Sequence, residues 1–456
     1  MGRAMSYKRY SKYKDSGVEW IGEIPQHWDK VKIARLGRLT KANGGSKEDN
    51  ADSGIPCIRY GELYTTYEHA IRKSRTYIRA DRLSEYTPIH HGDVLFAASG
   101  ETFEDIGRSA VTLLNEVACC GGDVIILKPE SDIDPLFLGY ALDSIASKAQ
   151  KALMGKGYTV VHIYADQLRE LIVALPPQIE QDAISSALDR ETARIDALIE
   201  KKTRFVGLLK EKRQALITHA VTKGLDPNVK MKDSGVEWIG EVPEHWDVAQ
   251  LGKVSISRCD GPFGSGLKSD HYTETGVRVV RLQNIGWAEF KGRDAAYIAP
   301  QYWRHELGAG HDVIPGDVLI AGLGDDNNPL GRACVAPPDI GDAMVKADCY
   351  RFRIGSRAIP DYVALILSAT SRSECGFLAT GATRDRLNLT LASARVIPLP
   401  QIAEQQAIVR TLIARTSLID LLVDKTQHSI TLLKERRAAL ITAAVTGQID
   451  LREEAA

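Results

Sequence analysis

The 456-residue sequence lacks the features that mark membrane-spanning, secreted and disulfide-rich proteins. It has no uninterrupted apolar run of about 18 residues, the length that crosses a bilayer. Residues 1–14 are basic and also lack an apolar stretch, so they predict a solvated tail rather than a secretion signal. The seven cysteines show no CxxC spacing, which predicts reduced, mostly buried thiols in a cytosolic protein. A net charge of −1 neither indicates nor excludes a nucleic-acid partner.

Complete catalytic motifs are also missing. The sequence contains no HExxH and no GxSxG. Gly261–Ser269 resembles a phosphate-binding loop, but Leu267 separates Gly266 from Lys268 and shifts the spacing by one residue. Asp326–Leu330 approaches the Asn-Pro-Pro-aromatic motif of amino-methyltransferases without its second proline or its aromatic residue. The chain is therefore expected to be non-catalytic by itself, and a self-contained methyltransferase is disfavoured.

A long internal repeat is the dominant feature of the sequence. The two opening segments, Lys14–Asp29 and Lys232–Asp247, are identical at 14 of 16 positions. A second pair of segments, Leu208–Thr222 and Leu432–Thr446, is identical at 12 of 15 positions. A period of more than 200 residues is too long for a solenoid, so it predicts two tandem domains, each followed by its own helix.

Between these copied segments, the two halves share an outline and differ in detail. Each reads as short strands separated by glycine and proline turns, with one helical run near its end, at 135–153 and at 360–378. The corresponding landmarks are Gly54–Arg59 and Gly276–Arg281, Gly92–Leu95 and Gly316–Leu319, and Gly107-Arg108 and Gly331-Arg332. The halves are therefore expected to share a scaffold and to differ in their surfaces.

Each half closes with a proline-free segment that predicts a helix of about 40 residues, or about 60 Å. The starts are Leu175-Pro-Pro-Gln178 and Leu399-Pro-Gln401. A seven-residue apolar repeat predicts that the two helices pair as an antiparallel coiled coil. The seam residues are Leu188, Ile195, Leu209 and Leu216, with Ile184, Leu198 and Phe205 between them, then Leu412, Ile419, Leu433 and Leu440, with Ile408 and Leu422. Breaks at Lys202 and Thr426 leave open helices that pack only on their own domains.

This order of motifs resembles the specificity subunits of Type I restriction-modification systems. The resemblance rests on the motifs GEIPQHWD and GEVPEHWD, on the repeated Gly-Asp-Val-Leu and Gly-Arg turns, and on LPPQIEQ at 175–181. It extends from about residue 15 to residue 450. It implies an α+β fold with two tandem pseudo-symmetric target-recognition domains joined by two long helices in an antiparallel coiled coil. The expected divisions are 1–27 (tail and opening segment), 28–175 (first recognition domain), 176–231 (central helix and linker), 232–398 (opening segment and second recognition domain) and 399–456 (C-terminal helix).

The resemblance also implies a function in the cytoplasm of a prokaryote. Each domain would read one half of a split, asymmetric site in double-stranded DNA, and the helices would set the spacer between the half-sites. The partners would be two methyltransferase subunits and the restriction (motor-nuclease) subunits, with no membrane. The chain would bind no metal or cofactor, while S-adenosylmethionine, ATP and magnesium would belong to the partner subunits.

Three loops in each half have the side chains and glycines that DNA contact requires. Lys, Arg and backbone N–H groups bind phosphates, whereas Asn, Gln and Arg read base edges. The candidate DNA-binding residues are Arg59, Tyr60, Ser99, Gly100, Thr102, Lys156, Tyr158, Arg281, Gln283, Asn284, Asp325, Asn327, Asn328, Thr383 and Arg384. Glycine-rich polar loops are first of all turns, so the structural interpretation of each loop stays open. Arg108 and Arg332 fit a structural role as well as a phosphate contact.

A protein of another class remains possible. The same halves and helices could form an assembly scaffold that binds partner proteins and no DNA. The divergent loops argue against it, because a scaffold has no reason to vary polar loops while its helices stay almost identical. The basic stretch 201–213 fits a solvated coiled-coil flank, a DNA-facing surface or a methyltransferase contact.

Overall fold

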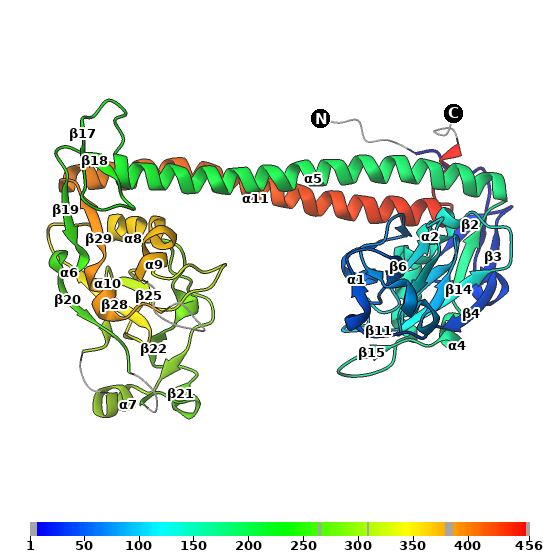
Figure 1. The fold of residues 1–456 in the computed structure, drawn as a ribbon, viewed down its shortest axis with the longest axis horizontal. Helices are drawn as coiled ribbons and strands as arrows, with labels where there is room; N and C mark the ends of the chain where they lie inside the picture. The colour runs from blue at the N-terminus through cyan, green and yellow to red at the C-terminus, as the bar shows by residue number, and fades with distance from the viewer. Residues whose placement is uncertain (1–6, 263–265, 308–309, 379–385, 453–456) are drawn as a thin grey trace. The chain divides into compact units, whose positions relative to one another are not determined.

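The computed structural model divides the chain into two compact units. It describes residues 7–262, 266–307, 310–378 and 386–452. The first unit comprises residues 1–203 and 427–456, and the second comprises residues 204–426. Each unit therefore contains part of both long helices, α5 (Gln178–Lys223) and α11 (Ile402–Val445), which are drawn in green and orange-red in Figure 1. No helix among the described residues is long and apolar enough to cross a membrane.

The two opening segments fold alike. Each forms a two-stranded antiparallel hairpin, followed by a tryptophan, Trp28 or Trp246, that is completely buried. The next strand then pairs with the strand that immediately precedes the long helix. These strands are β1 (Tyr13–Asp15), β2 (Glu23–Pro25), β3 (Asp29–Lys32) and β16 (Ile172–Leu175), and β17 (Met231–Asp233), β18 (Glu241–Pro243), β19 (Asp247–Gln250) and β29 (Val396–Leu399). The repeated motif thus joins both ends of each domain.

Two five-stranded sheets form the body of the first unit. Continuous apolar runs such as Val124–Leu127 become strands that are buried on both faces. The first sheet has the order β4 (Gly37–Lys41), β14 (Val124–Pro129), β10 (Val94–Ala97), β12 (Ser109–Thr112) and β7 (Ala70–Ile71). The second has the order β5 (Asn50–Ala51), β8 (Tyr77–Ile78), β6 (Ile55–Ile58), β13 (Ala118–Cys120) and β9 (Thr87–Ile89).

The second unit repeats this body with one strand fewer in its first sheet. Val94 pairs with Leu127 in the first unit, and Val318 pairs with Phe352 at the corresponding place in the second. The first sheet has the order β20 (Ser255–Cys259), β28 (Cys349–Ile354), β25 (Val318–Ala321) and β26 (Ala333–Val335). The second has the order β21 (Tyr272–Thr273), β23 (Tyr297–Ile298), β22 (Val277–Val280), β27 (Ala343–Val345) and β24 (Asp312–Val313).

The helical run at the end of each half is broken into two helices, so a single continuous helix was the wrong expectation. In the first unit the break falls at Ser144, whose extended backbone stops one helix and whose hydroxyl accepts a hydrogen bond from Ser147 N (3.3 Å) to cap the next. In the second unit the break falls at Thr370. The helices are α2 (Pro135–Asp143) and α3 (Ile145–Met154), and α8 (Pro360–Ala369) and α9 (Ser371–Leu378).

The two long helices contact each other and run in opposite directions, which confirms the predicted coiled-coil pairing and the α+β fold. In the first unit Asp196 of α5 lies 2.9 Å from Arg437 of α11. In the second unit Arg213 of α5 lies 2.8 Å from Asp420 of α11. The second pair lies 17 residues later along α5 and 17 residues earlier along α11, so one antiparallel register serves both pairs.

One line of the predicted helix seam is wrong. Leu188, Ile195 and Leu209 are buried as expected, but Leu198 and Phe205 are 43% and 45% exposed. In α11 the predicted seam residue Leu422 is also exposed. The second line follows four residues after the first rather than three, at the buried Thr192 and Val206 and the half-buried Ile199. Steps of three and four residues alternate along a helix face, and the apolar pattern alone allows either order.

Residues 7–14 of the basic N-terminal stretch pack on the first unit, although their lysines and Arg9 are exposed, which corrects the expectation of a solvated tail for this part. Tyr10 is buried, and its hydroxyl donates a hydrogen bond to Glu180 in the first turn of α5 (3.3 Å). The backbone N–H of Asp450 donates to the carbonyl of Lys8 (2.8 Å). The first described residues therefore pack on the segment that follows α11. Residues 1–6 lie outside the described residues.

The corrected seam predicts different costs for two neighbouring substitutions. Val206→Asp places a carboxylate at a buried position, so we expect it to lower the free energy of unfolding by about 2 kcal/mol or more. Phe205→Asp alters an exposed position and should change the free energy of unfolding by less than about 0.5 kcal/mol. Urea denaturation of the two variant chains measures both, and equal losses would refute this assignment of the seam.

Candidate nucleic-acid interface

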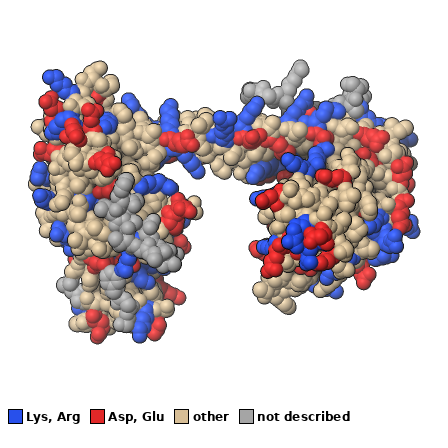
Figure 2. Space-filling view, viewed as in Figure 1, with Lys and Arg blue, Asp and Glu red and all other residues tan. Residues whose placement is uncertain are grey.

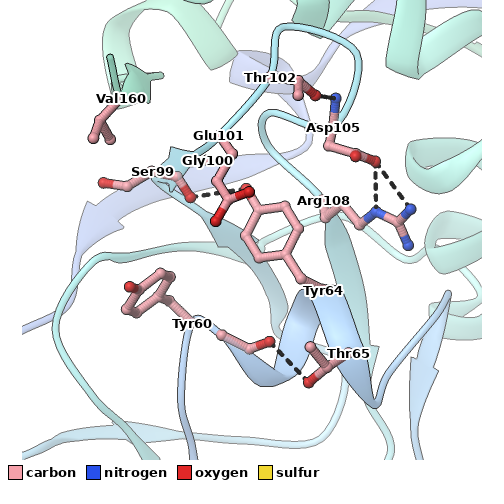
Figure 3. Close-up of a pocket in the computed structure, with 11 residues that line it drawn as sticks. Tyr60, Tyr64, Thr65, Ser99, Gly100, Glu101, Thr102, Asp105, Arg108 and Val160 are labelled. Carbon is pink, nitrogen blue, oxygen red and sulfur yellow. Dashed lines mark hydrogen bonds and ion pairs between the residues drawn. The ribbon is translucent and has the colours of Figure 1, made fainter. Parts of the chain in front are cut away.

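The three predicted loops of the first unit meet around one cavity of about 570 Å³. Tyr60 comes from the turn after β6, residues 99–102 from the loop after β10, and Val160 from the loop before β15 (Val161–His162). Figure 3 shows these side chains around the hollow. β15 pairs with β11 (Ser99–Gly100), which fixes the second loop against the third. Four of the predicted residues therefore line one site: Tyr60, Ser99, Gly100 and Thr102.

Tyr64 and Arg108 form the polar wall of this cavity. The Tyr64 hydroxyl donates to the Ser99 carbonyl (2.8 Å), and burial raises the pKa of Tyr64 to about 12, so the hydroxyl stays protonated. The Arg108 guanidinium donates to Asp105 (3.0 Å), whose own N–H donates to the Thr102 hydroxyl (3.3 Å; Figure 3). The wall thus carries both hydrogen-bond donors and acceptors, which reading of base edges requires.

The remaining candidates of the first unit lie outside the cavity. Tyr158 is fully exposed, and Lys156 is exposed in the same loop, with its backbone held to His162 by two hydrogen bonds. Arg59 instead lies over the Tyr86 ring (5.2 Å) and donates to the Ser46 carbonyl (2.8 Å). Lys156 and Tyr158 are free to contact a ligand, whereas Arg59 holds a neighbouring loop in place.

A buried arginine joins two of the predicted loops in the second unit. Arg332 donates to the carbonyls of Leu282 (2.9 Å) and Ile285 (2.7 Å) in the first loop. It also donates to the carbonyls of Leu323 (3.1 Å) and Asn328 (3.2 Å) in the second loop. Its side chain therefore fixes the relative position of the loops and is not presented to a phosphate. Arg108, at the matching position of the first unit, is half-buried beside the cavity instead.

The loop residues of the second unit divide into buried and exposed groups. Asn284 is 1% exposed, and its amide donates to the carbonyls of Lys291 (3.0 Å) and Arg293 (3.3 Å), so it shapes the loop rather than facing solvent. The half-buried Arg281 donates to the Asp294 carbonyl, whereas Gln283 is exposed. Asp325 and Asn327 are exposed and Asn328 is half-buried. Thr383 and Arg384 lie outside the described residues.

Hydrogen bonds within loop 322–328 of the second unit shape its exposed tip. The Asp325 carboxylate accepts from the backbone N–H groups of Asn328 (2.8 Å) and Asn327 (2.9 Å). These two hydrogen bonds lower the pKa of Asp325, so it remains a carboxylate acceptor. The loop is therefore preorganised before any ligand arrives.

Several lining residues were missed in the sequence. They are Gly61, Tyr64, Thr65, Glu101, Asp105 and Val160, whereas Arg108 had been considered both for a structural role and for a phosphate contact. Tyr64 could have been found from its nearness to the candidate Tyr60, because it lies in the short helix α1 (Glu62–Thr65) that directly follows the turn holding Tyr60. Val160 could not have been found, because the β11–β15 pairing that brings it to the cavity joins segments about 60 residues apart.

The two arginines should respond differently to removal of their charge. Arg332→Met leaves several buried carbonyls without a donor, so we expect the free energy of unfolding of the second unit to fall by about 2 kcal/mol or more. Arg108→Met removes a partly solvated ion pair and should cost less than about 1 kcal/mol. Chemical denaturation of both variants tests this difference, and a loss for Arg108→Met as large as that for Arg332→Met would contradict the assignment.

Comparisons with known proteins match this architecture. Residues 25–204 match the family model of the Type I restriction modification DNA specificity domain. The putative type I restriction enzyme MjaX specificity subunit of Methanocaldococcus jannaschii is 25% identical over 95% of this chain and 96% of the relative. The type I restriction enzyme EcoBI specificity subunit of Escherichia coli is 21% identical over 98% of this chain and 91% of the relative.

Solved structures share the fold along nearly the whole chain. A chain from a study of complex assembly and conformational transition of the type I R-M system aligns with a TM-score of 0.69 and 15% identity. It covers 92% of this chain and 98% of that one. The crystal structure of the HsdS subunit from Thermoanaerobacter tengcongensis aligns with a TM-score of 0.50 and 16% identity, over 93% and 98% of the two chains. At these identities the likeness concerns the fold.

The domain match, the length of the relatives and the shared fold all indicate the same class of protein. The matched domain lies in the first half, the relatives extend over both halves, and the paired long helices complete the shared fold. The chain is similar along nearly its whole length to Type I restriction-modification specificity subunits, and residues 25–204 match their DNA specificity domain.

Proposed function

We propose that the two units of this DNA specificity subunit each read one half of a split, asymmetric site in double-stranded DNA. The observation that carries the proposal is the contrast between a repeated scaffold and different loops. Strands β10 and β14 of the first unit pair in the same way as β25 and β28 of the second. A cavity with Tyr60 and Thr102 in one unit nevertheless corresponds to a loop tied by Arg332 in the other. Different loops on one scaffold read different sequences, so the two half-sites differ.

Apart from Arg59, the proposed DNA contacts are the described candidates that are exposed or half-buried, together with Thr383 and Arg384, which lie outside the described residues. Asn327 and Gln283 suit adenine edges, and Lys156 suits a phosphate. Tyr60 and Tyr158 offer ring faces that can pack against sugars or bases. The proposed set is Tyr60, Ser99, Gly100, Thr102, Lys156, Tyr158, Arg281, Gln283, Asp325, Asn327, Asn328, Thr383 and Arg384. Arg59 and Asn284 act indirectly, because each holds a loop in place.

The long helices fit the role of spacer between the half-sites. Helices α5 and α11 have 46 and 44 residues, and each continues from one unit into the other without a break. Figure 2 shows basic side chains along the paired helices. The stretch 201–213 of α5 contains six Lys and Arg residues, which are exposed or half-buried. Such side chains suit the phosphates of spacer DNA, and the helix pairing gives the spacer a fixed length.

Exposed apolar side chains on the same helices support docking of partner subunits. Leu198 and Leu208 of α5 are 43% and 52% exposed, and Leu422 and Leu432 of α11 are 40% and 49% exposed. Each α11 residue follows its α5 counterpart by 224 positions, so the repeat presents one apolar pair twice. Large exposed apolar side chains grouped on one element mark protein interfaces. Two copies of one partner, the methyltransferase subunit, match this arrangement.

The remaining activities would reside in partner subunits. Methyltransferase subunits would supply S-adenosylmethionine, and restriction subunits would supply ATP and magnesium chemistry in the prokaryotic cytoplasm. Specificity subunits of this family are non-catalytic and bind no cofactor themselves. This chain would therefore direct chemistry that its partners perform.

Methylation mapping tests the DNA-reading proposal. Cells expressing this chain with its methyltransferase subunit should show adenine methylation at one split, asymmetric motif, and the methylation should vanish without this chain. Long-read sequencing detects the modified bases. Asn327→Ala should relax one half of the motif and Thr102→Ala the other, because the two residues lie in different units. Equal loss at both halves would contradict the modular arrangement, and no chain-dependent methylation would favour a protein scaffold.

The repeated apolar pair predicts the methyltransferase stoichiometry. Leu198→Glu with Leu208→Glu should reduce the complex from two methyltransferase subunits to one, and the matched change at Leu422 and Leu432 should do the same. All four changes together should leave the chain without methyltransferase subunits. Native mass spectrometry of the purified complexes counts the subunits. Retention of two subunits by the fourfold variant would refute this docking surface.

A further inference from the structure

A buried lysine lies beneath the cavity of the first unit. Lys151 of α3 is completely buried, and its Nζ donates to the carbonyls of Gly107 (2.7 Å) and Leu142 (2.9 Å). The Ser109 hydroxyl lies 3.3 Å from the same nitrogen. Gly107 ends the loop that begins at Ser99, and its positive φ of 69° lets its carbonyl face the lysine. Lys151 thus fastens the base of a loop that lines the cavity.

The second unit has a different cation at the same place. Arg395, which is 1% exposed, donates to the carbonyls of Gly331 (2.5 Å) and Leu367 (2.7 Å). These carbonyls correspond to those of Gly107 and Leu142. The Arg395 guanidinium also donates to the buried Glu374 carboxylate (2.7 Å), so its charge is neutralised locally. Lys151 in the first unit and Arg395 in the second therefore bind corresponding pairs of carbonyls, although the two residues do not correspond in sequence.

Backbone contacts establish which residues correspond. The carbonyl of Leu171 accepts from Ile33 N (2.9 Å), and the carbonyl of Arg395 accepts from Leu251 N (2.8 Å) in the copied strand arrangement. Leu171 therefore stands where the second unit has Arg395.

The acidic partner has been replaced as well. Gln150 accepts from Ile172 N (3.0 Å), as Glu374 accepts from Val396 N (3.2 Å). The first unit thus has an amide and a leucine where the second has a carboxylate and an arginine, and Lys151 supplies the hydrogen-bond donor to the carbonyls of Gly107 and Leu142.

The surroundings of Lys151 hold little compensating charge. The charged groups that face it are Asp143 on α2, Lys148 on α3 and Arg108 beside the cavity. Asp143 is already paired with Lys148 (3.1 Å), and Arg108 with Asp105. Burial therefore lowers the pKa of Lys151 from 10.5 to about 7, against a smaller opposing effect of Asp143. An arginine at the corresponding place keeps its charge throughout this range.

We propose that Lys151 is a positioning residue for loop 99–107, and that it makes reading of the first half-site pH-dependent while Arg395 leaves reading of the second unaffected. The inference rests on the proposed reading of one half-site by each unit. The placed loop keeps Lys151 buried among the carbonyls of Gly107 and Leu142. A displaced loop opens this contact and exposes the amine to water.

The sign of the pH effect follows from proton binding. Exposure to water returns the pKa of Lys151 toward 10.5, so between about pH 7 and that value the displaced loop binds a proton that the placed loop lacks. Raising the pH within this window therefore favours the placed loop, by up to about tenfold per pH unit for one linked proton. Below about pH 7 both forms bind the proton, and the dependence disappears.

Binding of two half-mutated duplexes by the assembled complex tests the inference. One duplex keeps the first half-site and has the second scrambled; the other is reversed, with both sequences taken from methylation mapping. The ratio of their affinities, measured by fluorescence anisotropy from pH 6 to 9, cancels effects common to both. We expect the ratio to favour the first half-site increasingly above pH 7. Lys151→Met should make it independent of pH and weaken first half-site binding roughly two- to tenfold through lost hydrogen bonds.

A second variant, in which the Arg395 arrangement of the second unit replaces Lys151 in the first, is the control if Lys151→Met fails to fold. Gln150→Glu, Lys151→Cys and Leu171→Arg together install the arrangement of the second unit, which has Glu374, Cys375 and Arg395. This variant should read the first half-site with a flat pH profile. A flat wild-type ratio, or the wild-type slope in either variant, overturns the inference. Failure of wild type to discriminate either half-site would instead overturn the proposed function.

Discussion

The structure depends on one carboxylate at the start of each long helix. Glu180 lies 2.7 Å from His27 Nε2 and accepts hydrogen bonds from the buried Trp28 indole (2.9 Å) and from Arg452 (3.3 Å). The second unit places Glu404 2.8 Å from His245. This contact ties the opening segment to the first turn of the helix, where a negative charge also suits the helix dipole. The strand pairing before each helix joins the same two segments through backbone hydrogen bonds.

The two units keep the histidine–glutamate contact of this anchor and vary what it supports, since the Trp28 indole also donates to Glu180 whereas the buried Trp246 indole has no hydrogen-bond partner among the described residues. Both hold their loops with buried cations that bind backbone carbonyls, but Arg332 joins two loops in the second unit while Arg108 faces a cavity in the first. Buried carbonyls need donors, and any cation that reaches them satisfies this need. The scaffold therefore tolerates exchange of Lys151 for Arg395, and each reading surface can change without loss of the fold.

The long helices have separate buried and exposed lines of side chains. Thr192 and Val206 are buried and Ile199 is half-buried, while Leu198 and Leu208 are exposed and belong to the proposed partner surface. The same division recurs 224 residues later in α11. Because an antiparallel pair presents the two helices alike, a duplicated chain offers a second copy of each surface without a second gene product. Pairing of the helices and recruitment of partners are thus compatible.

The sequence alone determined the duplication, the two β-rich halves, the long antiparallel helices and the loops that meet at Tyr60, Ser99 and Thr102. These depend on repeated motifs, periodicity and turn residues, which are local properties. Only the tertiary structure decided the burial of Tyr10 and Asn284, the seam line at Val206 rather than Phe205, and the anchoring roles of Lys151 and Arg395. Burial and hydrogen bonding between segments far apart in sequence determine these features, and a local pattern does not record which distant carbonyl or side chain will be near.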